Sequence, residues 1–412
     1  MRTGRSIDLL VIGAQQSRGL ETPSPHEYDP FAPTIIRDPY PWYDWLRRQD
    51  GVFYSARRDL FVLSRYRDVL AAVRAHRSLS SAEGVAYQRR SFPIMLMMDP
   101  PDHTRLRRLV ARDFNSTTTQ AWRPTVERLV NAMLDRLLPD QVVDFVGAVA
   151  GPLPVTVIAE VLGIPSADHE KFKLWSDEAM EGFRLAEVES EDIVARTTTA
   201  LMELLAYFSA QLDRRRTAPR DDLLTRLLRP QEEERLTSRE LIYLCLQLLV
   251  AGHETTTNLL GNMILAFLEA PSQWARLKAR PELIPAAVEE VLRFDAPIQG
   301  FFRTVVEPFQ VAGATIPKDK RVLVLFAAAN RDPSQYPDPD RFLIDRNPTD
   351  HLAFGSGIHQ CLGAPLARLE GALVLERLIR SAARLELAGE VVRAANPALR
   401  GVARLPIRLV PS

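Results

Sequence analysis

One cysteine stands at the end of a glycine-rich loop, directly before a stretch with the periodicity of a long helix. The loop covers residues 354–363, FGSGIHQCLG, and the helical pattern runs from Ala364 to about Arg380. At a helix N-terminus the thiol of Cys361 lies among unpaired backbone N–H groups, which favour the thiolate form. The glycines let the backbone approach a flat ligand closely. A thiolate held in this way can be the axial ligand of a haem iron.

A second group of candidate residues lies in the middle of a long helical pattern. Residues 251–256 read AGHETT, and Ala251 and Thr255 share one face with Leu244 and Leu248. A small residue and a hydroxyl on that face would line a cavity. Because glycine and consecutive threonines are poor helix formers, and threonine hydroxyls compete for backbone carbonyls, we predict a local bulge here.

A third group consists of cations on one short helix. Residues 99–102, DPPD, predict a helix that starts with Asp99 as N-cap and Pro100 as its first residue. His103 and Arg107 then lie on one face, because they are four residues apart. The remaining basic residues fall on roughly the opposite face: Arg105, Arg108 and Arg112. One helix therefore carries two separate cationic stripes.

Together these patterns resemble cytochromes P450. The loop matches the haem-binding pattern F-x-x-G-x-x-x-C-x-G in full, and AGHET matches the oxygen-binding pattern [AG]-G-x-[DE]-T. The resemblance implies that Cys361 ligates haem b and that Phe354, Gly355, Gly363 and Ala251 contact it. It also implies O2 as co-substrate and electrons from NAD(P)H through external partners.

The same resemblance implies roles for residues around the haem. Thr255 would stabilise the activated oxygen, and Glu254 would feed protons towards it through water, which suits a reaction in a largely dry pocket. Basic residues would bind the haem propionates: His103, Arg107, Arg303 and His359. Arginine suits carboxylates because its planar fork binds them bidentately.

Further residues are assigned by the resemblance to support, docking and substrate binding. Glu290 and Arg293 match the Glu-x-x-Arg motif, and Arg346 matches the third member of that network, which braces the cysteine loop. The stripe of Arg105, Arg108 and Arg112 would dock an acidic ferredoxin, which a ferredoxin reductase supplies with electrons. The pocket walls would be largely apolar: Phe92, Ile94, Met95, Leu248, Ala251, Ile298 and Phe301. The implied reaction is hydroxylation, or O- or N-dealkylation, of a largely apolar small organic molecule.

Around these sites the sequence predicts a mainly α fold with small β-sheets. The central helix extends from a capping box, Thr237 and Glu240, to about Glu269. Short strands are predicted at residues 52–54, 60–63, 304–306, 310–311, 314–316 and 322–325. We expect a single large P450 domain over residues 28–412, with haem buried between the central helix and the cysteine loop. Residues 1–27 are expected to be poorly structured and flexible.

The composition limits the class of protein further. The chain has 412 residues, of which 46% are hydrophobic, so it can bury a large core. Lysine plus arginine and aspartate plus glutamate both total 52, so no overall field attracts nucleic acid or an anionic membrane. Two cysteines are too few for a disulfide framework, and no apolar window approaches the length that spans a bilayer. We therefore expect a cytoplasmic monomer without a membrane span.

Three alternatives remain open at this level. A zinc site built from His351, His359 and Cys361 would lack a clear fourth ligand. A P450 with atypical chemistry, such as aromatic coupling or peroxide-driven oxidation, is disfavoured by Glu254 and Thr255, since peroxide-driven members often lose this pair. A non-catalytic haem-binding protein would have no use for the pair.

Overall fold

Helices dominate the computed structural model, which describes residues 10–12, 28–49, 51–137, 141–184, 191–229 and 236–411. The α-helices are α1 (Pro33–Arg37), α2 (Tyr40–Arg47), α3 (Tyr66–Arg74), α4 (Asp102–Ala111), α5 (Ser116–Ala121), α6 (Arg123–Leu134), α7 (Pro152–Leu162), α8 (His169–Arg184), α9 (Glu191–Thr217), α10 (Leu223–Leu228), α11 (Ser238–Glu269), α12 (Pro271–Ala279), α13 (Ile284–Phe294), α14 (Phe326–Ala329) and α15 (Ala364–Ser381). Shorter helical segments are η1 (Met95–Met97), η2 (Arg112–Phe114), η3 (Val146–Ala150), η4 (Ser166–Asp168), η5 (Pro281–Leu283) and η6 (Gly357–His359).

The strands are short and gather into small sheets. They are β1 (Leu10–Ile12), β2 (Phe53–Ser55), β3 (Leu60–Leu63), β4 (Leu79–Ser80), β5 (Val142–Asp144), β6 (Phe301–Val305), β7 (Phe309–Val311), β8 (Ala314–Ile316), β9 (Arg321–Val324), β10 (Ala382–Leu387), β11 (Val391–Arg393), β12 (Val402–Arg404) and β13 (Pro406–Pro411). The sheet orders are β2-β3-β9-β6-β4, β10-β13-β5 and β1-β11-β12, with β7 and β8 as a hairpin. In the five-stranded sheet β3 and β9 are parallel and the other neighbours antiparallel. The predicted mainly α fold with small sheets is confirmed.

The local predictions agree with these elements to within a few residues. The predicted strands at 60–63 and 314–316 coincide with β3 and β8, and the other four are displaced by one to three residues at an end. Ala312 and Gly313 have φ values of 51° and 75°, as the mirror-image turn of a two-residue hairpin requires. Of the predicted flexible segment 1–27, only Leu10–Ile12 are described, and they form β1 against β11; the rest lies outside the described residues.

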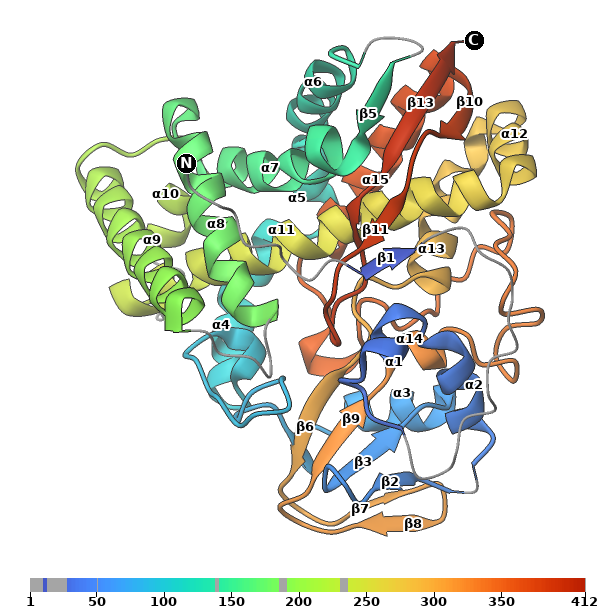
Figure 1. Cartoon of the computed structure of the whole chain (residues 1–412). Coiled ribbons are helices and arrows are strands. Elements are labelled where there is room, and N and C mark those ends of the chain that lie inside the picture. The colour runs from blue at the N-terminus through green and yellow to red at the C-terminus, as the bar shows by residue number, and fades with distance from the viewer. Residues whose placement is uncertain are drawn as a thin grey trace.

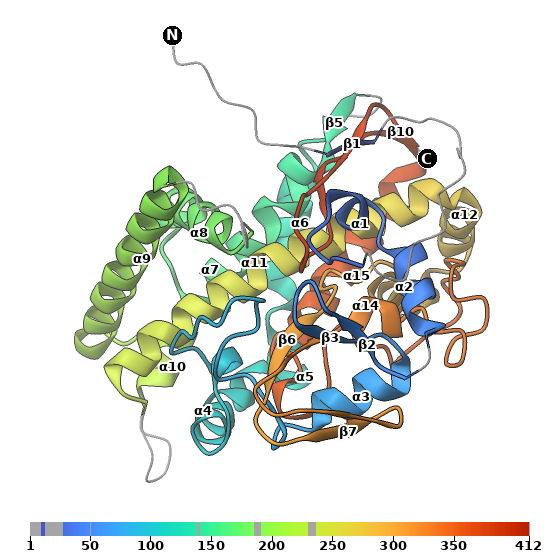
Figure 2. The same ribbon diagram turned by 60° about the horizontal axis from the view of Figure 1, so that its bottom comes forward.

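Helix α11 crosses the whole molecule and organises the rest (Figure 1). Its 32 residues begin after the N-cap Thr237, whose capping box with Glu240 is present as predicted. The helix packs against α7, α8, α9, α13 and α15, and its residues from Asn258 to Phe267 are all buried. The five-stranded sheet lies at one end of the molecule and the sheet of β10, β13 and β5 at the other, in both views (Figures 1 and 2).

The predicted bulge in α11 is wrong, because the helix runs without a break through residues 251–256. The Thr255 hydroxyl does donate to the Ala251 carbonyl oxygen, at 2.7 Å. A carbonyl oxygen has two lone pairs, so this bond can be added without displacing the backbone amide. The packing of both flanks of α11 in the core outweighs the low helix propensity of the motif.

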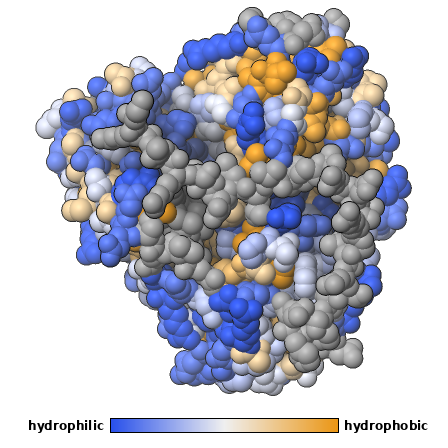
Figure 3. Space-filling model, viewed as in Figure 1, coloured by the Kyte–Doolittle hydropathy of each residue, from blue (hydrophilic) through white to orange (hydrophobic). Residues whose placement is uncertain are grey.

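The surface is mixed in character. The face seen in Figure 3 is mostly hydrophilic, with hydrophobic side chains gathered near the C-terminal strands. Two of the exposed large hydrophobic residues belong to that sheet, Leu387 on β10 and Val142 on β5. Within the ranges that the structure describes, no helix combines the length and the apolar character that crossing a bilayer requires.

Candidate active site

The cysteine loop folds back on itself before α15 begins. The carbonyl oxygen of Phe354 accepts the backbone N–H of Cys361 at 2.8 Å, which closes the loop. Gly355 and Gly357 have φ values of 66° and 73°, a region that glycine enters without a steric penalty. A Cβ on Gly357 would lie 2.9 Å from the carbonyl oxygen of Val73, so α3 also excludes a side chain there. The sequence of the loop therefore sets where the cysteine points.

The thiol of Cys361 is accessible, yet protein surrounds it on enough sides to affect its ionisation. Burial raises the pKa of Cys361 above its ordinary value, and the N–H of Gly363, the guanidinium of Arg107 and the N–H of Ala364 only partly oppose this. The N–H groups at the helix end therefore do not suffice to favour the thiolate as predicted, because burial has the larger effect on the pKa. A coordinated metal cation would deprotonate the thiol outright.

Four basic residues from three segments gather beside this loop. His103 and Arg107 lie on α4, Arg303 on β6, and His359 in the cysteine loop. The ring centroids of His103 and His359 are 4.4 Å apart. Burial, with Arg303, His103 and Arg107 nearby, lowers the pKa of His359 to about 3. Burial and the neighbouring Arg321 lower the pKa of Arg303 to about 10.

These four basic residues, of which the two arginines are cations, have the character of a site for a dianion. Among the residues that the structure describes, no carboxylate forms an ion pair with Arg107 or Arg303, and the buried Nδ1 of His103 has no hydrogen-bond partner. Buried charges are costly unless they are paired, so a ligand that brings two carboxylates fits here. Haem has two propionates, and the residues present fit it.

Two positions, one on α11 and one in the cysteine loop, are open to a ligand. Ala251 is exposed although it lies mid-way along a helix that is otherwise largely buried. A Cβ on Gly363 would meet no atom within 4 Å, so this part of the loop is open on the side where the side chain would stand. Both observations favour a planar group approaching these backbones.

Helix α4 begins differently from the prediction. Its N-cap is Pro101, which makes no side-chain cap bond, and Asp102 is its first residue, so the assignment of Asp99 as N-cap is wrong. The Asp99 carboxylate instead accepts the hydroxyl of Ser80 and, at 3.0 Å, the N–H of Ser81. These donors, at and directly after β4, take up the oxygens that would otherwise cap the helix.

The three arginines of the second stripe differ in their surroundings. Arg105 forms an ion pair with Glu240 at the start of α11, which neutralises part of its charge within the chain. Arg108 on α4 and Arg112 at its C-cap are exposed. The docking role of the stripe stays a prediction.

On α11 the residues of the AGHETT motif point in different directions. Thr255 is half-buried on the same side as Ala251, whereas Glu254 is buried with 4% of its surface exposed. His253 faces α8, where its Nδ1 lies 2.9 Å from the Ser176 hydroxyl. The Thr255 hydroxyl donates its proton to the Ala251 carbonyl, so its oxygen is left to accept a hydrogen bond from another group.

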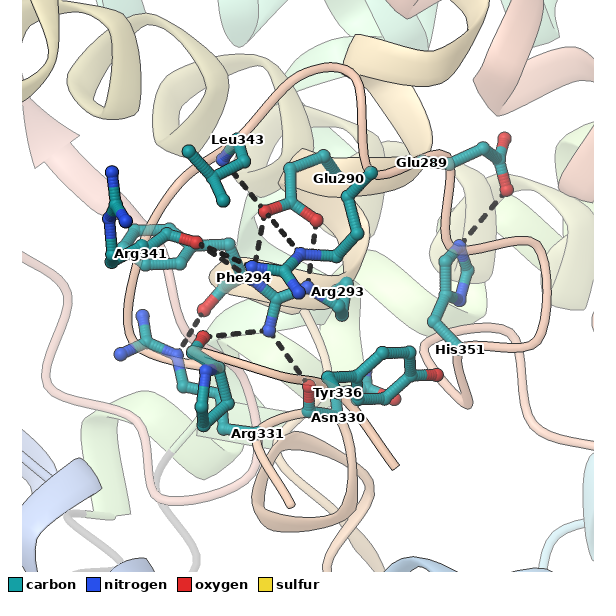
Figure 4. Close-up of polar contacts among 12 residues, drawn as sticks. Glu289, Glu290, Arg293, Phe294, Asn330, Arg331, Tyr336, Arg341, Leu343 and His351 are labelled. Carbon is teal, nitrogen blue, oxygen red and sulfur yellow. Dashed lines mark hydrogen bonds and ion pairs between the residues drawn. The ribbon is translucent and has the colours of Figure 1, made fainter. Parts of the chain in front are cut away.

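The predicted Glu-x-x-Arg network is assembled on α13 (Figure 4). Arg293 binds both oxygens of Glu290, at 2.7 and 2.8 Å, and neither residue is exposed. Arg346 reaches the same carboxylate at 3.2 Å, and Leu343 donates its backbone N–H to it at 2.9 Å. The other end of Arg293 donates to the carbonyls of Asn330 and Pro339. The structure thus brings all three predicted members together.

The predicted pocket residues pack in different parts of the structure, and their role in a pocket stays a prediction. Ile94 and Met95 line a small cavity with Leu244 and Gln247 of α11, and Leu248 is buried in the main hydrophobic cluster. Ile298 and Phe301 instead pack against the smaller cluster beneath the five-stranded sheet, and Phe92 is 40% exposed.

Sequence reasoning missed two features of this region. The Gln247 side chain accepts the N–H of Met95 at 2.7 Å, and a polar residue one turn before Ala251 was the available signal. A larger groove lies between the N-terminal helices, the five-stranded sheet and the turn before β12, and its lining is rich in aromatic and aliphatic residues: Phe31, Ile35, Tyr43, Tyr87, Phe302 and Leu399. Its walls come from five separate segments, so no single pattern could reveal it.

The zinc alternative finds no support. Among the described residues there is no group of three or more His, Cys, Asp and Glu side chains that could hold a metal ion. His351 contacts Glu289 at 3.1 Å, and the ring of His359 lies tilted against that of His103. The two histidines of the proposed zinc site are therefore engaged in different interactions.

Comparisons with known proteins agree with this geometry. The family model described as Cytochrome P450 matches residues 189–382. The chain is 39% identical to the beta-dihydromenaquinone-9 omega-hydroxylase of Mycobacterium tuberculosis over 93% of this chain and 79% of that protein. It is 38% identical to the vitamin D(3) 25-hydroxylase of Pseudonocardia autotrophica over 95% and 99% of the two chains. The structure of CYP109Q5 from Chondromyces apiculatus superposes with a TM-score of 0.85 and 35% identity, covering 94% of this chain and 100% of that one.

The fold, the cysteine loop and the four basic residues beside it define a haem-thiolate protein, and the chain belongs to the cytochrome P450 family. It is a P450 monooxygenase of the bacterial type, which uses haem b and O2 to hydroxylate organic substrates with electrons from external redox partners.

Proposed function

We propose that Cys361 ligates the haem iron and that His103, Arg107, Arg303 and His359 bind the propionates. The observation that carries this proposal is the cluster of two arginines and two histidines beside Cys361, which is exposed whereas Cys245 is buried. When haem is bound there, it supplies the activation of O2. The protein residues then provide position, protons and the exclusion of water.

The proton supply is assigned to α11. The Thr255 hydroxyl donates its hydrogen to the Ala251 carbonyl. Its oxygen can therefore accept a hydrogen bond from a water or from a protonated oxygen. Glu254, buried next to it in sequence, is the carboxylate from which protons would be passed through water. The buried pair of Glu290 and Arg293, with Arg346, would brace residues 337–346, which precede the cysteine loop.

The proposed substrate is a largely apolar small organic molecule. Relatives that cover most of the chain are named for oxidation of vitamin D(3) and of beta-dihydromenaquinone-9, both lipophilic molecules. The apolar side chains of Ile94, Met95 and Leu244 near α11 are consistent with such a ligand. We further propose a ferredoxin and its reductase as the redox partners, and a monomer that works in the cytoplasm.

The test is turnover by the reconstituted system. A substrate is first identified by the spectral shift that it causes on binding. With NADPH, a surrogate ferredoxin and its reductase, wild-type protein should then consume oxygen only when this substrate is added. Thr255→Ala should keep its haem, while product formed per NADPH falls roughly tenfold or more and hydrogen peroxide rises, since positioned proton transfer contributes about 100- to 10,000-fold to such steps.

The matched control for this experiment is Thr257→Ala. Thr257 lies on the same helix, two residues further on and therefore on another face, and its buried hydroxyl has no hydrogen-bond partner. Thr257→Ala should leave the amount of product formed per NADPH close to the wild-type value. An equal fall of this amount in both variants would contradict the proposed role of Thr255.

Charge reversal on α4 tests the docking proposal. The double variant Arg108→Glu/Arg112→Glu should slow reduction by ferredoxin about tenfold at low salt, because exposed charges steer an acidic partner. The difference should shrink as salt shortens the screening length to about 8 Å. Stopped-flow reduction rates measure this. Arg48→Glu is the control, because Arg48 is the C-cap residue of another helix, α2, and its side chain is 75% exposed. Equal rates in the two variants would leave Arg108 and Arg112 as solubilising charges.

A further inference from the structure

Two adjacent glutamates on α13 bind different partners. Glu290 holds Arg293 and Arg346, whereas Glu289 contacts His351 on the other side of the helix (Figure 4). Glu289 also binds Arg368 of α15. His351 precedes the cysteine loop and Arg368 follows it, so Glu289 contacts residues on both sides of the loop.

The contact with Arg368 is a bidentate ion pair. The guanidinium Nε and Nη2 lie 2.6 and 2.8 Å from the two carboxylate oxygens of Glu289. This geometry fixes the plane of the guanidinium as well as its position. The same guanidinium lies 4.6 Å from the ring centroid of Phe354, the first residue of the cysteine loop, where a cation and an aromatic face attract each other.

The contact with His351 restrains Phe354 from a second direction. Nδ1 of His351 accepts the N–H of Ala353 at 3.2 Å, so the ring proton is on Nε2, which donates to Glu289 at 3.1 Å. The ring centroid of His351 lies 5.7 Å from that of Phe354. One carboxylate therefore orients two side chains that both contact the Phe354 ring.

Phe354 acts directly on the cysteine. Its carbonyl accepts the N–H of Cys361 at 2.8 Å, so a shift of Phe354 would move the cysteine backbone. Burial alone would raise the pKa of Glu289, but its bonds with Arg368 and His351 outweigh this and lower the pKa to about 2. The carboxylate is therefore ionised at neutral pH and can bind both partners.

We infer that Glu289 is a positioning residue for the cysteine ligand, which it serves by holding Arg368 and His351 against Phe354. The inference rests on the proposed ligation by Cys361. It predicts that the state of the thiolate, and not only the fold, depends on the negative charge of Glu289.

The test is the stability of thiolate ligation in the reduced, carbon monoxide-bound holoprotein. In mild urea, Glu289→Gln should lose the red-shifted thiolate band on the order of tenfold faster than wild type, because a neutral amide leaves the Arg368 charge without its partner. Glu289→Asp keeps the charge and should fall between the two. Far-ultraviolet circular dichroism, recorded in parallel, follows unfolding of the whole chain.

Glu376→Gln is the matched control. Glu376 lies on α15, as Arg368 does, and forms a 2.6 Å ion pair with Arg123 of α6. Band loss that precedes unfolding in Glu289→Gln, with the control like wild type, supports the inference. Band loss that only accompanies unfolding, or that is equal in the control, overturns it. If Glu289→Gln does not fold, the same criteria apply to Glu289→Asp. Absence of the band in wild type would instead reject Cys361 as the ligand.

Discussion

Replacing Cys361 with serine should abolish the red-shifted carbon monoxide band of the reduced protein and reduce oxygenation to background. Serine preserves the volume and the loop, in which the cysteine N–H is bound by the Phe354 carbonyl. It removes the sulfur donor, whose electron density favours cleavage of the oxygen–oxygen bond. The effect should therefore appear in the spectrum and the activity while the circular dichroism of the fold stays unchanged.

The chain provides a matched control for this experiment in its other cysteine. Cys245 is fully buried in α11, and burial raises the pKa of its thiol to about 12, so it remains a neutral core side chain. Cys245→Ala should keep the thiolate band. A band that persists in Cys361→Ser, or that disappears in Cys245→Ala, would contradict the assignment of the ligand.

The features that sequence reasoning predicted well are those encoded over short distances. The capping box of Thr237 and Glu240 needs only four consecutive residues, and the start of α11 followed from it. The turn at Ala312 and Gly313 is equally local. The members of the Glu290 network were predicted from the family resemblance. A Glu and an Arg three residues apart are by themselves an ordinary helical pair, and the third member, Arg346, lies 56 positions from Glu290.

The features that were missed depend on contacts between distant segments. Asp99 does not cap α4, because Ser80 and Ser81 bind its carboxylate, and the ion pair of Arg105 with Glu240 joins residues 135 positions apart. Strand β10 was not predicted because it follows α15 without glycine or proline, and its register is set by β13 near the C-terminus. The role inferred for Glu289 could not be read from the sequence, since its two partners lie 62 and 79 positions away.

Removing the charge of Glu290 should be the most damaging single change apart from loss of the proposed haem ligand, Cys361. In Glu290→Gln the guanidinium of Arg293 stays fully buried without a counter-ion, and breaking such a pair costs about 3–5 kcal/mol of unfolding free energy. That is a large fraction of the roughly 5–15 kcal/mol by which domains are stable. Urea unfolding followed by circular dichroism, together with the haem content after purification, measures the loss.

A surface pair close to the same network gives the comparison. Arg276 and Asp345 lie 2.7 Å apart but are 42% and 41% exposed, so Asp345→Asn should cost less than about 1 kcal/mol. Similar losses in Asp345→Asn and Glu290→Gln would show that burial does not determine the contribution of Glu290. The double variant Glu290→Met/Arg293→Met removes the unpaired charge and should recover part of the stability. It should not recover haem retention fully, because Arg346 and the N–H of Leu343 would still lack the carboxylate that holds residues 337–346 in place.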